Sequence, residues 1–394
     1  MKIIGIEIFP LRVTFESVIK ESFGTVGKNE DHVVIRMHTD EGISGLGEAS
    51  TLGPYYSGES GATVIDMLIN YFFPKVLDGE DPFNVDKIHR AMDKVVYGHT
   101  VAKAAVDFAL YDIMAKSLEI PVYKLLGGAT EKRVPVRANI GIDTPENMAA
   151  QSKSYTDAGY HGLKIKVGLN PPEDVDRVAA IRAAIGPEHV IDVDVNGAYL
   201  PKTAIWTLNQ MGKYWPVIVE QPVDRDDIEG MAFVRRRVNV PIGACEAALT
   251  IPQVMRIIKH EAADFFNYKI DRSGGFFRAN QVVYAIDGAG LFTVPSEQLC
   301  FGIGIAAQAH FVVSTSLWKT PLGIGAGILR IAKKDTTRDM EDDIVFNTPI
   351  IEKGYFEVPE GIGLCVELNE ENVMKYLANG KKPFVVGKKS DASI

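Results

Sequence analysis

The sequence predicts an α/β protein in which a modified (β/α) barrel is joined to an α+β capping domain. Two observations predict this class. From about Val134, short apolar runs alternate with helical stretches in six or more βα units, the pattern of a parallel sheet. Before Val134, strands come first and helices follow, which is typical of an α+β unit. So many successive units favour a closed barrel of the TIM type, with an open doubly wound sheet as the alternative.

The capping domain is expected at residues 1–130. Apolar residues alternate along 33–38, and the turn at 39–42 closes a hairpin. Residues 102–118 have the pattern of a helix that ends before Pro121, because proline stops a helix.

The barrel is expected at residues 131–343, and the segment 344–394 has strand and turn character that is too irregular for more barrel. We therefore expect this last segment to return to the capping domain and to complete it together with the N-terminal segment.

Composition narrows the function classes. The net charge of −9 over 394 residues argues against nucleic acid as a partner, because a phosphate backbone needs a basic surface. Three cysteines are too few for a disulfide framework and suggest reduced thiols in a cytoplasmic protein. No run approaches the ~20 apolar residues of a membrane helix, and the N-terminus lacks the features of a signal peptide.

Charged side chains stand at or just after the end of each apolar run. Singly, each such lysine is more often solvated, and each acid more often caps the next helix. Together they are 23 to 28 residues apart, close to the roughly 31 residues per unit of a typical barrel. Barrel enzymes place their active sites at the rim where the strands end, so the series indicates a site: Lys166, Asp194, Glu220, Glu246, Lys269 and Glu297.

Three of these residues indicate a metal. Asp194, Glu220 and Glu246 follow three successive strands and are expected to converge. Carboxylates at close range repel one another, and a hard divalent cation resolves this, so all-oxygen ligation suggests Mg²⁺ or Mn²⁺.

The flanking lysines indicate the reaction. Lys166 and Lys269 stand on either side of the carboxylates, which suits removal of the proton next to a substrate carboxylate. A metal on that carboxylate stabilises the enediolate that forms, while a lysine takes the proton. Lys164, two residues before Lys166, is expected to lower the pKa of Lys166 and keep it neutral.

Several motifs carry a resemblance to a known family over nearly the whole chain. They are AKAAVDFALYDIMAKSLEIPVYKLLGG, KIK, DVN, EQP, KIDRSGG and GYFEVPEGIGLCVEL. The sequence resembles the enolase superfamily, specifically the mandelate racemase/muconate lactonizing enzyme family. The resemblance implies that Lys166 and Lys269 are the acid/base catalysts and that Lys164 assists. It also implies the lysine–lysine subgroup, typified by muconate cycloisomerases, o-succinylbenzoate synthases and N-acylamino acid or dipeptide epimerases.

The mandelate racemase subgroup instead uses a histidine on the seventh strand. Here that strand ends in VPSEQL, and the nearest histidine, His310, is expected to be a packed structural residue.

Two positions depart from the subgroup's pattern. Its fifth strand usually carries an Asp-Glu pair with Asp as the third ligand, whereas this chain has Cys245-Glu246. We prefer Glu246, because two carboxylates nearby favour Mg²⁺ over a soft metal, and we place Cys245 and Asn196 beside the ligands. Cys300 stands where muconate cycloisomerases look to have a glutamate, which counts against lactonization unless Glu297 compensates.

Loops of the capping domain are expected to cover the substrate. The candidates are residues 21–24, with Phe23, and residues 51–60, with Tyr55 and Tyr56. Simple packing between the domains is the alternative role for the tyrosines. Cys300 is a further candidate to contact the substrate.

The preferred hypothesis is a racemase or epimerase that moves a proton from one face of the substrate to the other between two lysines. A cycloisomerase or a dehydratase on the same scaffold is the alternative, and a non-catalytic ligand-binding barrel is a remote one. The expected partner is a small carboxylate substrate, without nucleic acid or membrane, and the chain is expected to form a homo-oligomer.

Overall fold

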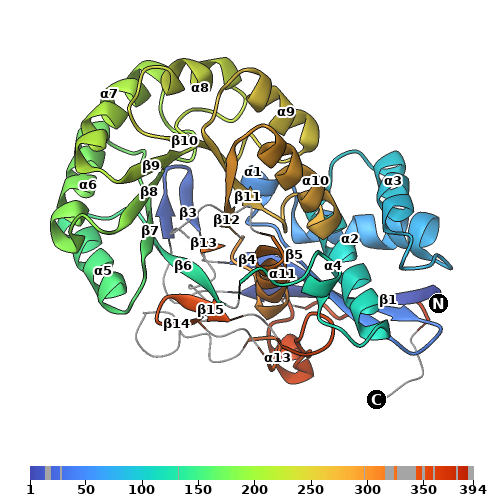
Figure 1. The fold of residues 1–394 in the computed structure, drawn as a ribbon. Helices are drawn as coiled ribbons and strands as arrows, with labels where there is room; N and C mark the ends of the chain where they lie inside the picture. The colour runs from blue at the N-terminus through green and yellow to red at the C-terminus, as the bar shows by residue number, and fades with distance from the viewer. Residues whose placement is uncertain are drawn as a thin grey trace.

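The structure is a computed structural model that describes residues 1–13, 19–26, 29–131, 133–296, 298–315, 324–325, 343–347, 351–357, 360–378 and 380–388. The chain folds into a barrel and a smaller capping unit that lies against it (Figure 1). The predicted fold class, a modified barrel with an α+β cap, is confirmed.

The barrel is closed. In the described part of the chain, eight parallel strands pair in sequence order, and the last pairs with the first through Ile324 and Val136. This closure excludes the open doubly wound sheet. The strands are β6 (Arg133–Ile140), β7 (Gly162–Lys166), β8 (Val190–Asp194), β9 (Val217–Glu220), β10 (Ile242–Ala244), β11 (Phe265–Lys269), β12 (Phe292–Ser296) and β13 (Ile324–Gly325).

Helices follow the first seven of these strands. They are α5 (Pro145–Asp157), α6 (Pro171–Ile185), α7 (Pro201–Met211), continued by η3 (Gly212–Tyr214), α8 (Ile228–Arg235), α9 (Ile251–Lys259), α10 (Gly275–Gly288) and α11 (Gly302–Val313). Four of these helices have proline in the first turn. Backbone N–H groups there have no acceptor within the helix, so the N–H that proline lacks is not missed. None of the helices in the described residues combines the length and apolar character that crossing a bilayer requires.

The cap is built on a four-stranded antiparallel sheet in the order β16-β1-β4-β5. Its strands are β1 (Ile3–Val13), β4 (Glu30–Thr39), β5 (Ser44–Ser50) and β16 (Phe384–Gly387). The predicted hairpin between β4 and β5 is confirmed. A second hairpin, β2 (Ile19–Glu21) with β3 (Gly24–Val26), extends toward the barrel rim (Figure 1).

The helical part of the cap follows the sheet in the chain. Its elements are α1 (Pro54–Ser57), α2 (Gly61–Met67), the π-helical η1 (Leu68–Leu77), α3 (Val85–Val95), α4 (Thr100–Ser117) and η2 (Val122–Lys124).

The C-terminal segment serves both units. β14 (Ile351–Glu352) and β15 (Tyr355–Glu357) form a hairpin that pairs with β6 of the barrel. After α13 (Glu370–Lys375), the chain hydrogen-bonds to β1 and then adds β16 to the edge of the cap sheet. The segment also contacts the cap before α13, because Gly363 exchanges backbone hydrogen bonds with Ile120 and Val122, and the N–H of Leu364 donates to Asp112 on α4.

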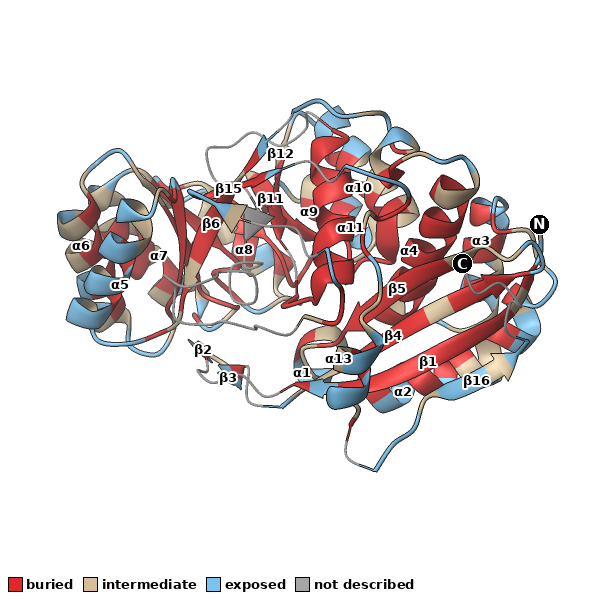
Figure 2. Ribbon diagram, turned by 90° about the horizontal axis from the view of Figure 1, so that it is seen from below, coloured by how far each residue is buried: buried red, intermediate tan, exposed pale blue. Residues whose placement is uncertain are grey.

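Helix α4 joins the cap to the barrel. Its residues 101–115 are buried on all sides, because one side packs on β5 and another on α10 (Figure 2). Asp107 on α4 accepts hydrogen bonds from the N–H groups of Phe276 and Phe277 in the first turn of α10. His89 is 2.8 Å from the same carboxylate. This buried contact fixes the cap relative to the rim of the barrel.

We expect Gly47→Ala to lower the free energy of unfolding by about 1–3 kcal/mol, because overpacking forces backbone shifts. A Cβ at Gly47 would meet the carbonyl oxygen of Ala105 well inside van der Waals contact. Urea unfolding measures the effect. Gly288→Ala is the control, since it lies at the exposed end of α10 with open space around it. Equal stability of the two variants would contradict the close approach of α4 and β5.

Candidate active site

The end of β7 carries two lysines that share one carboxylate. Lys166 donates to Asp194 Oδ2 at 2.8 Å, and Lys164 Nζ lies 2.9 Å from the same oxygen. Lys164 also donates to Glu220 Oε2 at 2.6 Å. Alternation along β7 points both lysines into the barrel, and all four side chains are buried. Strands β7, β8 and β9 thus place two cations against two carboxylates.

The residues that follow β8 and β9 have strained backbones. Asn196 has a φ of 49° and Gln221 a φ of 40°. Residues other than glycine rarely adopt positive φ, and such residues cluster at functional sites. Asn196 connects three side chains, because it accepts from Lys166 at 3.2 Å, donates its N–H to Asp194 at 3.0 Å, and donates its amide to Glu246 at 2.7 Å.

Two carboxylate oxygens in this site have no hydrogen-bond partner among the described residues. Glu220 Oε1 and Glu246 Oε2 are both buried and unpaired. The potential ligand atoms of Glu220, Glu246 and Cys245 lie within 4.8 Å of one another. Unpaired oxygens of this kind fit a hard divalent cation. Asp194 is not part of this compact group, because its oxygens face the two lysines and the N–H of Asn196.

Cys245 offers a poor ligand. Burial, together with the charges of Glu220 and Glu246, raises the pKa of its thiol, and only a thiolate binds metal well. The sulfur lies 3.7 Å from the hydroxyl of Tyr56 and 3.6 Å from Nη2 of Arg272.

Lys269 stands on the opposite side of the barrel from Lys166. Its strand, β11, is four strands from β7 in the eight-stranded ring. Its Nζ is 4.8 Å from the centre of the Tyr56 ring, and it forms no ion pair within the described part of the chain. Burial lowers the pKa of Lys269, although the charges of Cys245 and Glu220 oppose this.

Lys166 has the opposite electrostatic environment. Burial lowers its pKa, but the charges of Asp194, Glu21 and Glu220 outweigh burial and raise the pKa well above its ordinary value. The two lysines do oppose each other's charge, but the expectation that Lys164 would keep Lys166 neutral is wrong for this structure, because the carboxylates dominate. Glu21, from the β2–β3 hairpin, lies 3.0 Å from Lys166 Nζ.

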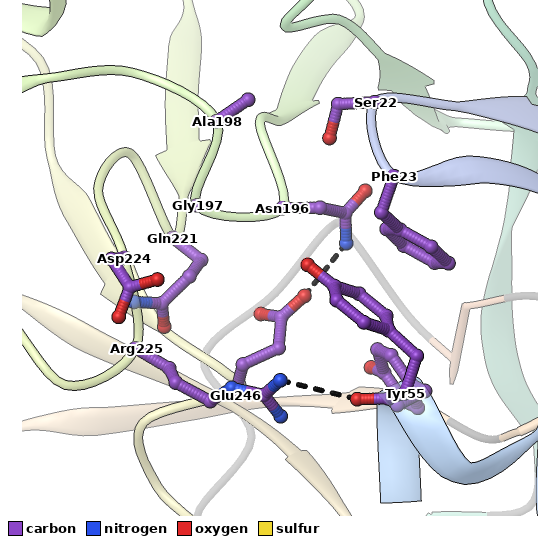
Figure 3. A pocket seen from close by; sticks show the side chains of 11 residues that line it. Ser22, Phe23, Tyr55, Asn196, Gly197, Ala198, Gln221, Asp224, Arg225 and Glu246 are labelled. Atoms are coloured by element: carbon purple, nitrogen blue, oxygen red, sulfur yellow. Dashed lines mark hydrogen bonds between the residues drawn. The ribbon is translucent and has the colours of Figure 1, made fainter.

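A cavity of about 110 Å³ opens between the cap and the rim. Phe23 stacks on Tyr55 with ring centres 4.9 Å apart, and Arg225 donates to the carbonyl of Tyr55 at 3.1 Å (Figure 3). The three predicted aromatic residues thus line a cavity and also pack between the two units. The lining residues are Ser22, Phe23, Tyr55, Tyr56, Asn196, Gly197, Ala198, Gln221, Asp224, Arg225 and Glu246.

Two other residues singled out in the sequence, Cys300 and His310, do not line this cavity. Cys300 is buried, donates to Asp271 at 3.1 Å and does not line this cavity. Glu297 lies outside the described residues. His310 is buried, and its Nδ1 accepts from the N–H of Tyr123 at 3.2 Å, which agrees with a structural role.

Sequence reasoning missed several contacts of the site. Gln221 and Arg272 belong to the motifs EQP and KIDRSGG, yet their bonds to Cys245 were not foreseen. Asn267, which donates to Glu220, lies two residues before Lys269, so strand alternation alone could have found it. Glu21 lies in the segment 21–24 that was expected to cover the substrate, but its pairing with Lys166 was not foreseen, because its partner lies on a distant strand.

Family models match both units of the chain. Residues 3–127 match the mandelate racemase/muconate lactonizing enzyme N-terminal domain, and residues 147–372 match the enolase C-terminal domain-like family.

Curated relatives and solved structures agree with these models. The N-succinyl-L-Arg/Lys racemase of Bacillus cereus is 32% identical over 95% of this chain and 98% of its own length. Its crystal structure superposes with a TM-score of 0.90 at 31% identity, covering 98% of this chain and 100% of that one.

Two further relatives have other activities. The hydrophobic dipeptide epimerase of Enterococcus faecalis is 32% identical over 80% of this chain and 88% of its own. Its crystal structure with Mg and the dipeptide L-Leu-L-Tyr has a TM-score of 0.85 at 29% identity, covering 93% of this chain and 100% of that one. Muconate cycloisomerase 1 of Acinetobacter baylyi is 33% identical over 73% of this chain and 78% of its own.

A capped barrel with lysines and carboxylates at its rim, matched by these relatives, defines an enzyme of the isomerase class. The chain belongs to the mandelate racemase/muconate lactonizing enzyme family of the enolase superfamily.

The buried His310 should make stability depend on pH. Burial lowers the pKa of His310 to about 4, against an ordinary value near 6.5, so the folded state favours the neutral ring. The buried neutral ring therefore stabilises the folded state fully above pH 6.5. As the pH falls toward 4, the free energy of unfolding should decrease by about 3 kcal/mol.

In His310→Asn, the amide oxygen can still accept from Tyr123, but nothing titrates at this position. The stability of the wild type should therefore fall relative to this variant between pH 6.5 and 4, as measured by urea unfolding. His161→Asn, at an exposed position, controls for the loss of an imidazole. A constant difference across that pH range would contradict a buried neutral His310.

Proposed function

We propose that this enzyme is a metal-dependent racemase or epimerase that moves the α-proton of a carboxylate substrate between Lys166 and Lys269. The observation that carries the proposal is the position of the two lysines. They end strands β7 and β11, half the barrel apart, and the carboxylate-bearing ends of β8, β9 and β10 lie between them. A substrate bound between the lysines would present opposite faces of its α-carbon to them.

The proposed metal ligands are Asp194, Glu220 and Glu246. The unpaired oxygens of Glu220 and Glu246 and the oxygen-rich donor set support Mg²⁺, with Mn²⁺ as a substitute. When bound, the cation would stabilise the negative charge that develops on the substrate carboxylate. The unpaired oxygen of Glu246 supports it as the third ligand, because a site that already holds two carboxylates favours a hard cation over one that binds thiolate.

The chain's own residues would then handle the proton. Burial lowers the pKa of Lys269, which favours the neutral form needed in a base. Lys166 is held by oxygen acceptors, which favour the ammonium form needed in an acid. One lysine takes the α-proton and the other returns a proton to the opposite face, and their roles exchange for the other enantiomer. Lys164, between Asp194 and Glu220, would keep the carboxylates in place.

The proposed substrates are N-acylated amino acids or dipeptides, and the proposed subgroup is the lysine–lysine one. The racemase from B. cereus and the epimerase from E. faecalis act on compounds of these kinds. The aromatic wall of the cavity, Phe23 with Tyr55, suits an apolar part of such a molecule. Cys300, bonded to Asp271 away from the cavity, supports proton transfer over lactonization.

Exchange in D₂O tests the reaction. With Mg²⁺ and a panel of D and L N-succinyl amino acids and dipeptides, the wild type should exchange the α-proton of at least one compound and interconvert its stereoisomers. Lys166→Ala and Lys269→Ala should each slow interconversion by about 10²–10⁴-fold, the range for loss of an acid or base. Each should still exchange the stereoisomer that faces the remaining lysine. Proton NMR measures both rates.

Lys202→Ala, with an exposed lysine on α7, is the matched control and should behave as the wild type. Interconversion at the wild-type rate in either lysine variant would contradict the two-lysine mechanism. Absence of exchange by the wild type across the panel would contradict the proposed function.

Calorimetric titration with Mg²⁺ tests the ligands. Glu220→Gln and Glu246→Gln should weaken binding by at least about tenfold, because even residues that only support metal ligands contribute 10–100-fold. Cys245→Ser should bind nearly as the wild type, and the exposed Glu188→Gln is the matched control. Loss of binding in Cys245→Ser with normal binding in Glu246→Gln would assign the third ligand to the cysteine.

A further inference from the structure

We infer that Glu21 is a positioning residue whose carboxylate, supplied by the capping hairpin, holds the amino group of Lys166 in place for its proton transfer. The inference rests on the proposed function, in which Lys166 serves one face of the substrate.

Oxygens from three residues surround the amino group of Lys166. A lysine ammonium has three N–H donors. Three oxygens surround it, from Glu21 at 3.0 Å, Asp194 at 2.8 Å and Asn196 at 3.2 Å. They come from different elements: the β2–β3 hairpin, the end of β8 and the loop after it. A long side chain that loses much rotational freedom on ordering is therefore fixed in one arrangement.

Of the three side chains that contact Lys166 Nζ, Glu21 alone has no second partner within the described residues. Asp194 is shared with Lys164 and is a proposed metal ligand. Asn196 also donates to Glu246. Within the residues that the structure describes, the side chain of Glu21 has no ion pair or hydrogen bond other than that with Lys166. It is 8% exposed, so water does not screen the pair strongly.

Two hydrogen bonds hold the β2–β3 hairpin against the barrel. The carbonyl of Lys20 accepts from the N–H of Ile142 at 2.8 Å, and the hydroxyl of Ser22 donates to the carbonyl of Val195 at 3.0 Å. These bonds fix the residues on both sides of Glu21 against the loops after β6 and β8. The next residue, Phe23, lines the cavity (Figure 3). The segment that covers the substrate thus also supplies the carboxylate that positions Lys166.

Lys166 and Lys269 differ in that a carboxylate of the cap contacts only the first of them within the described residues. Lys269 contacts the Tyr56 ring and has no carboxylate of this kind in the described part of the chain. Loss of Glu21 should therefore impair proton transfer on one face of the substrate only. A change that merely loosens the cap would impair both faces, and this difference makes the inference testable.

The experiment measures α-proton exchange in D₂O with Mg²⁺, separately for the two stereoisomers of the best-exchanging compound in the panel of N-succinyl amino acids and dipeptides. Lys166→Ala first identifies the stereoisomer that Lys166 serves. In Glu21→Ala, kcat for exchange of that stereoisomer should fall by about tenfold to a hundredfold, the effect of misplacing a reacting group. Its KM, and the exchange of the other stereoisomer, should change by less than about threefold.

Three further variants separate the explanations. Glu21→Gln keeps an acceptor oxygen and should recover most of the lost rate, because a hydrogen bond from the Lys166 ammonium to an amide oxygen is still charge-assisted. Lys20→Ala removes an exposed side chain from the same hairpin and is the matched control. Ser22→Ala removes a bond that holds Glu21 in position, so it should slow mainly the stereoisomer that Lys166 serves, and by less than Glu21→Ala does.

Equal slowing of both stereoisomers in Glu21→Ala, or no slowing of either, would overturn the inference while leaving the two-lysine mechanism intact. A wild type that exchanges no compound of the panel would overturn the proposed function, and the inference with it.

Discussion

The site depends on a buried group of opposite charges, centred on Lys164 between Asp194 and Glu220. Charges taken out of water cost several kcal/mol each unless they are well paired. Lys164 provides this pairing for carboxylates on two neighbouring strands, and Lys166 extends it to Glu21 on the cap. Because Asp194 and Glu220 are paired with these lysines, β8 and β9 can end in buried carboxylates. One oxygen each of Glu220 and Glu246 has no partner among the residues that the structure describes.

Two acidic residues of the cap accept hydrogen bonds from the starts of barrel helices, and these contacts fix the position of the cap over the site. Asp107 accepts from the first turn of α10, and Glu48 accepts from the N–H groups of Phe301 and Gly304 at the start of α11. Free N–H groups and the helix dipole both favour a carboxylate at that position. These contacts orient the cap sheet, and the hairpin and α1 then extend from it over the rim.

Much of the site could be predicted from the sequence because each strand of a barrel ends at the same rim. A charged residue at the end of an apolar run is therefore expected at that rim, as Lys166, Asp194 and Lys269 illustrate. Contacts between distant segments could not be predicted this way. The pair of Glu21 with Lys166 and the burial of α4 on all sides depend on how the cap docks, and the contact of Cys300 with Asp271 depends on how two barrel loops meet. The raised pKa of Lys166 was not predicted either, because the pattern does not show how closely Asp194 and Glu21 pair with its amino group.

The pairing of β16 with β1 has a consequence for how the molecule is made. During synthesis the first strand of the cap leaves the ribosome long before its neighbour, because the whole barrel is encoded between them. Until then one edge of β1 is open, and open strand edges invite pairing with other chains. The exposed Phe384 and Val385 show that the strand that covers this edge contributes little to the core. Its role is to close the edge of the cap sheet once the barrel is complete.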